Sequence, residues 1–235
     1  TYSIPRFRRT GKSASQLRGY IAEGLFSSQA EIDSWAYQSA STRPGDIKYR
    51  DINGDGKIDN EDETIIGRTR VPEIMYGYTF SAKYKNFDVS LFLQGTGHSD
   101  FYMGQDAKGS SDRGVRFPFK NDKPRKDHIN SWTVDNPDPN AKYPRLSTIE
   151  GMNYVTSSFW VVNTAYLKLK SLELGYNLEQ RLLKKIRVDN MRIYLNFYNL
   201  WTIYSSMPKD FDVENQNYNA YPQQFVTSLG VNITF

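Results

Sequence analysis

The chain has 235 residues, 14% of them aromatic, and a mean hydropathy of −0.66, so it is polar, rich in aromatic residues and long enough for one large domain. It contains no run of eighteen apolar residues and no cysteine, which excludes a membrane-spanning helix, disulfides and thiolate chemistry. The 30 basic and 26 acidic residues are interspersed and give a net charge of +4, so we expect no nucleic-acid partner.

The N-terminal segments are weakly patterned. Residues 1–10 are compatible with a basic strand, and residues 17–26 have extended character. Residues 27–35 predict a short helix that begins after a serine cap. The first five residues, Thr-Tyr-Ser-Ile-Pro, lack the basic and apolar regions of a signal peptide, so we expect the sequence to start within a longer protein or after processing.

Residues 51–62 form an acidic twelve-residue stretch with the ligand order of an EF-hand calcium loop. Oxygen donors stand at positions 1, 3, 5, 7, 9 and 12, and Gly56 at position 6 permits the sharp turn. A hard cation needs six or more converging oxygens, and alternate residues of a tight loop supply them. The candidate ligands are Asp51, Asn53, Asp55, Lys57 through its main-chain carbonyl, Asp59 and Asp62.

Two features limit this prediction of structural calcium. Position 12 is Asp62 in place of the longer, bidentate glutamate, so the loop must close more tightly or let water complete the shell. No amphipathic helix precedes Asp51, which favours a static clamp over a paired-helix switch. The alternative is a surface turn without an ion, because Asp, Asn and Gly favour turns for their own reasons.

The clearest strands follow this loop. Residues 76–84 and 87–93 alternate apolar and polar side chains with a strict period of two, and the tight Lys85-Asn86 connection predicts a β-hairpin. Residues 94–158 are polar and too long for an ordinary loop, which indicates a functional connection. The next strand, at 160–176, changes the face of its leucines near Lys170-Ser171, so we expect a bulge there.

The C-terminal part alternates again. Residues 178–186 predict a short amphipathic helical turn, and residues 188–198 and 225–235 predict two further strands. The last residue, Phe235, is in phase with the apolar face of the final strand.

The pattern as a whole favours an all-β fold, a transmembrane antiparallel β-barrel. Its strands have one apolar face with aromatics and one polar face, and short and very long connections alternate. If the last strand ends at the periplasm, every long connection lies outside the cell. About seven strands cannot close a pore of that kind, and an open edge cannot sit in lipid, so the chain must be part of something larger. A soluble β-sandwich also shows alternation and remains the competing interpretation.

The order of short motifs along the chain is similar to that of a known family. The motifs are residues 19–26, 44–56, 66–67, 76–78, 87–95, 143–146, 159–160, 166–170, 174–176, 199–200 and the closing Phe235. Together they resemble the C-terminal part of SusC/RagA-type TonB-dependent outer-membrane transporters of Bacteroidetes. The match departs from the usual family pattern before Asn199 and at residues 208–212.

The resemblance implies that residues 1–235 are the C-terminal segment of a twenty-two-stranded barrel, supplying about the last seven strands. It implies extracellular placement of the calcium-like loop 51–62 and of the long loop 94–158, with the plug domain and the TonB-contacting part absent from this sequence. The implied partners are the remainder of the barrel and plug, TonB, outer-membrane lipid and a SusD-like surface lipoprotein that acts as a lid, in a dimer of transporter-lipoprotein pairs. The implied function is TonB-energised import of oligosaccharides or peptides across the outer membrane.

Catalytic signals are weak throughout. His98 and His128, the only histidines, do not stand in metal-binding or hydrolytic spacings, so we expect no catalytic residues. Trp160 and Trp201 lie near strand ends and fit an interfacial aromatic girdle or loop packing better than a sugar-stacking site, so we assign no substrate contact. The alternative function is that of a secreted, soluble, calcium-stabilised β-domain that binds glycans.

Overall fold

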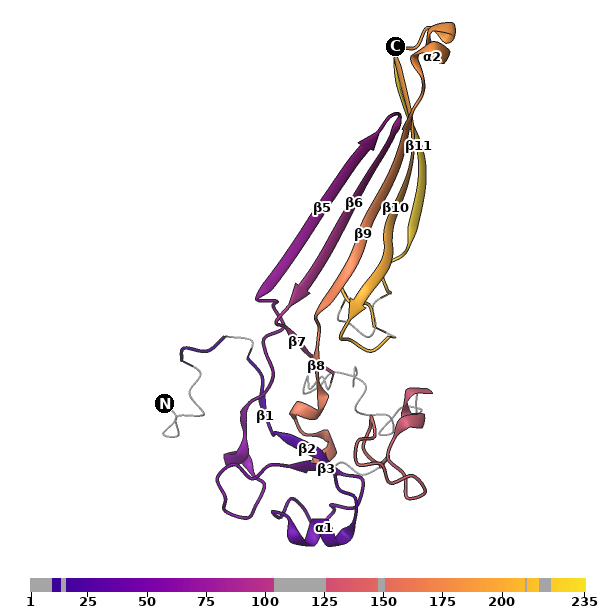
Figure 1. Cartoon of the computed structure of the whole chain (residues 1–235). Coiled ribbons are helices and arrows are strands. Elements are labelled where there is room, and N and C mark those ends of the chain that lie inside the picture. The colour runs from indigo at the N-terminus through magenta and orange to yellow at the C-terminus, as the bar shows by residue number, and fades with distance from the viewer. Residues whose placement is uncertain (1–9, 14–15, 104–125, 148–150, 210, 216–220) are drawn as a thin grey trace. The chain divides into compact units, whose positions relative to one another are not determined.

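A computed structural model describes residues 10–13, 16–103, 126–147, 151–209, 211–215 and 221–235 (Figure 1). The chain divides into two compact units. We call residues 71–99 with 163–235 the sheet unit, and residues 1–70 with 100–162 the loop unit. No helix among the described residues is both long enough and apolar enough to cross a membrane.

The sheet unit is one antiparallel sheet of long strands in the order β11-β10-β9-β6-β5 (Figure 1). The strands are β5 (Ile74–Tyr84), β6 (Phe87–Gly97), β9 (Tyr166–Asn177), β10 (Asn190–Ser205) and β11 (Val226–Thr234). The predicted hairpin is confirmed, since Tyr84 pairs with Phe87 across the Lys85-Asn86 turn. The predicted helical turn is α2 (Gln180–Ile186), which connects β9 to β10.

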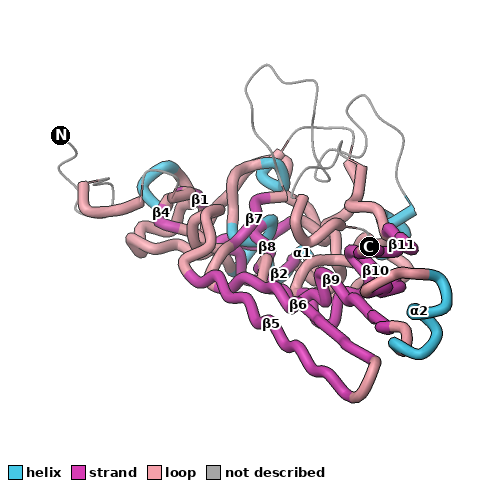
Figure 2. Tube along the Cα trace, turned by 90° about the horizontal axis from the view of Figure 1, so that it is seen from above, coloured by secondary structure: helices cyan, strands magenta, loops and turns pink. Residues whose placement is uncertain are grey.

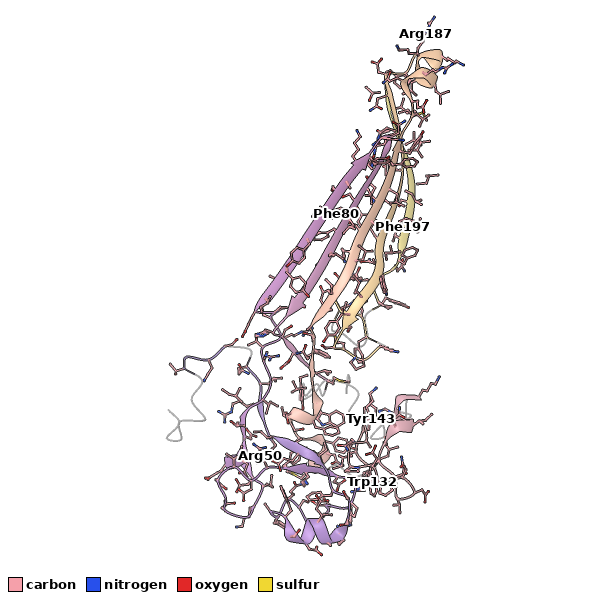
Figure 3. All side chains as sticks on the ribbon, in the orientation of Figure 1. Arg50, Phe80, Trp132, Tyr143, Arg187 and Phe197 are labelled. Carbon is pink, nitrogen blue, oxygen red and sulfur yellow. The ribbon has the colours of Figure 1, made fainter. Side chains whose placement is uncertain are left out.

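Alternation gives the sheet one apolar face that stays uncovered. Phe80 is 57% exposed on β5, and Leu229 is 74% exposed on β11. Figure 3 shows Phe80 and Phe197 on the strands of this sheet. A soluble sandwich would bury such a face against a second sheet. The described residues of the sheet unit provide no such second layer.

The predicted face change in β9 is confirmed as a bulge. The β6–β9 register shifts between Phe92 and Leu93, and the β9–β10 register shifts at the same level, between Tyr198 and Trp201. Leu169 therefore pairs with Leu93 and Leu172 with Leu91, so both leucines return to one face. The bulge reconciles an irregular leucine spacing with a single apolar surface.

The loop unit consists of short elements around an aromatic core, and Figure 2 shows how little of it is helix. Its paired strands are β1 (Arg18–Gly19) with β4 (Thr64–Ile65), β2 (Ala22–Leu25) with β3 (Ile47–Tyr49), and β7 (Asp100–Tyr102) with β8 (Val161–Asn163). Where the loop unit is described, its helices are α1 (Gln29–Ser34) and the 3-10 turns at Asn60–Asp62, Lys126–Asn130, Met152–Tyr154 and Ser158–Trp160. The buried core includes Phe26, Tyr49, Trp132, Tyr143 and Trp160.

A helix cap and a buried carboxylate hold parts of the loop unit in place. The Ser28 hydroxyl accepts the Glu31 N–H and begins α1, as the serine cap predicts. The buried Asp46 carboxylate accepts the Arg43 N–H at 2.8 Å and the Asn153 amide at 2.7 Å, which joins two segments far apart in the sequence.

Three expectations about strands are corrected. The sheet holds five long strands, because residues 17–26 form the short strands β1 and β2 in the loop unit, and residues 1–9 lie outside the described part. The strand expected at 160–176 is divided in two: Val161–Asn163 form β8, which pairs with β7, and β9 begins at Tyr166 after the Asn163 side chain has accepted the Ala165 N–H. Strand β6 extends to Gly97, so the long connection starts after residue 97 and not at 94.

Candidate functional site

The polar face of the sheet carries a charge network that spans three strands. Arg192 on β10 reaches over β9 and bonds with Asp88 on β6, and its guanidinium also donates to Glu173 at 2.7 Å. The Arg192 side chain crosses β9 at Gly175, where a Cβ would collide with Arg192 and Asp88. Asn177 donates to Asp88 at 3.1 Å. The charges on this face therefore satisfy one another across the strands while the opposite face remains apolar.

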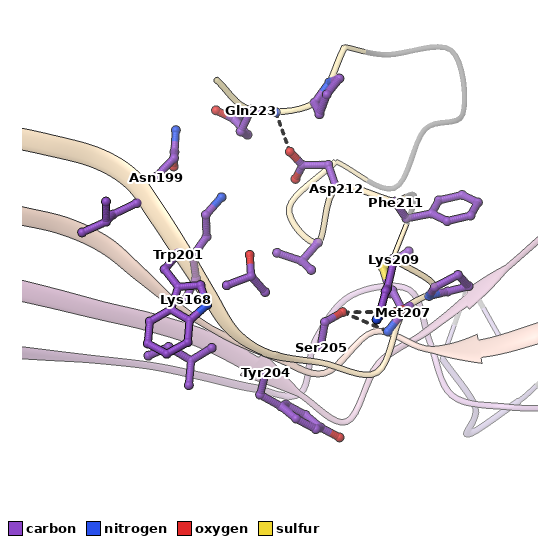
Figure 4. Close-up of a pocket in the computed structure, with 16 residues that line it drawn as sticks. Lys168, Asn199, Trp201, Tyr204, Ser205, Met207, Lys209, Phe211, Asp212 and Gln223 are labelled. Atoms are coloured by element: carbon purple, nitrogen blue, oxygen red, sulfur yellow. Dashed lines mark hydrogen bonds between the residues drawn. The ribbon is translucent and has the colours of Figure 1, made fainter. Parts of the chain in front are cut away.

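A cavity of about 640 Å³ lies in the sheet unit between the end of β10 and the connection to β11 (Figure 4). Its wall combines aromatic, apolar and polar side chains, among them Trp201, Tyr204, Met207, Phe211 and Asp212. The volume falls within the range of small-ligand sites. Trp201 is 62% exposed, whereas Met207 is buried.

Asp212 ties this connection together. Its carboxylate accepts the N–H groups of Glu214 at 2.8 Å, Asn215 at 3.1 Å and Gln223 (Figure 4). Burial alone would raise the pKa of Asp212, but the three backbone donors outweigh it and hold the pKa below its ordinary value. The carboxylate thus joins the two arms of the connection.

A buried lysine-glutamate-lysine cluster fixes the same connection to β9. Glu214 accepts from Lys168 at 2.9 Å and from Lys170 at 2.7 Å, and the side chains of Lys168 and Glu214 are only 6% and 12% exposed. Burial opposes ionisation of Glu214, but the two lysines lower its pKa below the ordinary value. We call Lys168, Lys170 and Glu214 the latch. It holds one wall of the cavity in place.

The predicted calcium loop is compact in the structure. Asp62 is fully buried, and its carboxylate accepts the N–H groups of Ile52 at 2.8 Å, Asn53 at 3.3 Å and Asp59 at 3.0 Å. The last position of the loop thereby binds its second, third and ninth positions. Gly54 and Gly56 both have φ near +80°, which glycine adopts without strain.

The other aspartates of this loop point their oxygens at backbone N–H groups. Asp51 accepts from Gly54 at 2.6 Å and Gly56 at 2.8 Å, and Asp55 accepts from Lys57 at 2.9 Å. Within the described part of the chain, no three Asp, Glu or His side chains are arranged as a metal-binding group. Calcium binding therefore stays a prediction.

The tryptophan and histidines singled out in the sequence make contacts that need no functional explanation. Trp160 is 3% exposed and donates its indole N–H to the Asn153 carbonyl at 3.1 Å, so it packs in the core of the loop unit, in agreement with loop packing and not with an interfacial girdle. His128 is buried, with its ring 4.8 Å from that of Tyr143. His98 is exposed and lies 3.5 Å from Glu73. The contacts of Glu214 had no signal in the sequence, because its lysine partners are more than 40 residues away.

These features define a class of protein. Long antiparallel strands with one exposed apolar face, one polar face and long connections are typical of the wall of a transmembrane β-barrel. Comparisons with known proteins show which proteins of this class the chain is similar to. The chain is 26% identical to TonB-dependent receptor P3 of Formosa agariphila, over 97% of the chain and 23% of that protein. It is 23% identical to TonB-dependent receptor SusC of Bacteroides thetaiotaomicron, over 92% of the chain and 20% of that protein.

A solved structure of the RagAB peptide transporter has the same fold. It superposes with a TM-score of 0.63 at 19% identity and covers 94% of this chain and 23% of that one. No family model matches the chain. The resemblance to SusC/RagA-type TonB-dependent transporters is confirmed, and the chain spans less than a quarter of the length of these relatives.

Proposed function

We propose that this chain is the C-terminal part of the barrel wall of a TonB-energised importer in the outer membrane. The observation that carries the proposal is the sheet of five long strands with a continuous exposed apolar face. Such a face is stable against hydrocarbon and unstable against water. The similarity to TonB-dependent receptors supports the same function.

The two edges of the sheet support assembly with further strands. Strands β5 and β11 each have one neighbour in the sheet, so each carries a row of backbone N–H and C=O groups without a strand partner. Unpaired backbone groups cost several kcal/mol each in hydrocarbon, so a barrel must close. The remainder of the barrel supplies the missing neighbours, and a plug, TonB and a SusD-like lipoprotein lid complete the importer.

The cargo is a peptide or an oligosaccharide. The solved relative is described as a peptide transporter. The cavity beside the connection from β10 to β11 is lined by both aromatic and polar side chains, which suits either kind of cargo.

We also propose that residues 51–62 bind calcium as a structural ion. The six oxygen positions support this, and so do the two glycines that give the loop its curvature. In Asp51 and Asp55, a carboxylate oxygen that accepts one N–H keeps a further lone pair for a cation, whereas Oδ1 of Asp62 already accepts two N–H groups. Bound calcium would neutralise the crowded acids and stiffen the loop.

A pair of neighbouring substitutions tests the membrane proposal. Ile233 lies on the apolar face of β11 and is 46% exposed, whereas Asn232 lies on the opposite face and pairs with Arg192. We expect Ile233→Asp to prevent assembly in the outer membrane and Asn232→Asp to permit it, because only the first places a charge in lipid. The measurement is the amount of folded protein in the outer-membrane fraction. A soluble, folded and monomeric Ile233→Asp protein would support the soluble glycan-binding domain instead.

A further inference from the structure

One end of the sheet unit displays four cations that have no partner among the described residues. We call this the turn end, defined by the Lys85-Asn86 turn and by residues 178–189 between β9 and β10. The four cations on and beside α2 are all exposed: Arg181, Lys184, Lys185 and Arg187. None of them makes an ion pair or a side-chain hydrogen bond with any described residue. Figure 3 shows Arg187 at the extremity of this unit.

The segment that carries these cations is firmly held. Leu183 is completely buried and Val188 is 8% exposed, which is unusual for so short a connection. The Gln180 amide donates to the Asp189 carbonyl at 2.8 Å, and the Asp189 N–H donates to Thr234 at 2.9 Å. The cations therefore project from a fixed scaffold and not from a loose tail.

Exposed apolar groups lie at the same end. Tyr84 and Phe87, on either side of the Lys85-Asn86 turn, are 73% and 63% exposed, and Leu182 on α2 is 55% exposed. The Asn177 N–H donates to the Asn86 carbonyl at 2.8 Å and joins the two turns. The Lys85 ammonium lies 5.4 Å from the centre of the Tyr84 ring. The turn end therefore carries both exposed cations and exposed apolar side chains.

We propose that the turn end binds the headgroup phosphates of anionic phospholipids through Arg181, Lys184 and Lys185. This inference rests on the proposed membrane location. Residues 178–189 contain four cations against two carboxylates, Glu179 and Asp189, so the field at the surface is positive. An amphiphile matches both features of the turn end, because its phosphate meets the cations and its acyl chain meets Leu182, Tyr84 and Phe87. An acidic protein partner would account for the cations but not for the exposed apolar side chains beside them.

The test uses the complete transporter, purified in detergent and stripped of lipid. Phosphatidylglycerol is titrated against it, with phosphatidylcholine as the neutral lipid, and the melting temperature is followed. The test variant carries Arg181→Gln, Lys184→Gln and Lys185→Gln. The control carries Lys12→Gln, Lys126→Gln and Lys142→Gln, three exposed cations of the loop unit, and has the same net charge.

We expect phosphatidylglycerol to stabilise the unmodified protein and the control more than phosphatidylcholine does. The test variant should bind phosphatidylglycerol about a hundredfold more weakly, since each cation near an anionic surface contributes about fivefold. Equal binding by test variant and control would overturn the proposal. Equal stabilisation by inorganic phosphate would also overturn it, because the site would then recognise a free anion. Failure of the unmodified protein to associate even with phosphatidylcholine vesicles would instead refute the membrane location.

Discussion

Removing the charge of Glu214 should release the connection between β10 and β11 without unfolding the sheet. In Glu214→Gln, the ammonium of Lys168 remains 6% exposed with no carboxylate beside it, and Lys170 lies close by. Breaking a buried ion pair by removing one partner costs about 3–5 kcal/mol, and the amide retains part of the hydrogen bonding, so we take about 3 kcal/mol. This corresponds to roughly a hundredfold increase in the open population of the connection.

Limited trypsin digestion measures that opening, because Lys209 is an exposed cleavage site in the same connection. Cleavage after Lys209 should accelerate about a hundredfold when opening is fast relative to cleavage. Glu73→Gln, at a side chain that is 61% exposed, is the matched control and should leave the rate unchanged. Replacing all three latch residues by Met or Leu should restore protection, since an apolar cluster carries no uncompensated charge. Unchanged cleavage in Glu214→Gln would refute the reasoning.

The other predictions concern pH, sheet assembly and calcium. The pKa values of Glu214 and Asp212 are lowered in the fold, so the stability that these carboxylates contribute is present above the ordinary carboxylate pKa and is lost as pH falls through the lowered values. Pepsin, which cuts in acid where trypsin does not, should therefore cut the connection between β10 and β11 more readily as the pH is lowered. Gly175→Val should destabilise the barrel by about 1–3 kcal/mol and lower the temperature at which the protein unfolds and changes its mobility on gels. Gly97→Val, whose Cβ meets only Ile74 at 3.9 Å, should leave that temperature unchanged. Asp55→Asn should weaken calcium binding about tenfold by calorimetry, and unchanged binding would place the ion elsewhere.

Much of the sheet could be predicted because its signal is local. A strand with one wet and one apolar face repeats every two residues, so the faces of β6 and β11 follow directly from the sequence. The bulge in β9 was predictable for the same reason, as the leucines at 169 and 172 break the period. Strand β10 was harder. Its expected end at 198 is where Asn199 takes a positive φ, and the strand continues to Ser205 beyond that irregularity.

The loop unit and the latch depend on contacts that no local pattern reveals. Trp160 is buried with its ring near those of Tyr143 and Phe159, and the Asn153 carbonyl accepts its indole N–H. Glu214 gains its role only when the chain brings Lys168 and Lys170 to it. Side chains that bond over such distances are fixed by the tertiary fold and not by spacing.

The two units differ in where their apolar side chains lie, and therefore in the surroundings in which each is stable. In the loop unit, residues such as Phe26, Tyr49 and Trp132 form a core that water cannot reach. In the sheet unit the buried apolar residues Leu183, Val188, Met207 and Val213 lie in the connections and Tyr166 lies at the first position of β9, whereas the strands keep their apolar face exposed. A soluble β-sandwich would take its stability from a second sheet on that face. In the proposed membrane location this sheet takes it from hydrocarbon, and the polar bonds across the other face, such as Arg192 to Asp88, then favour the observed strand pairing.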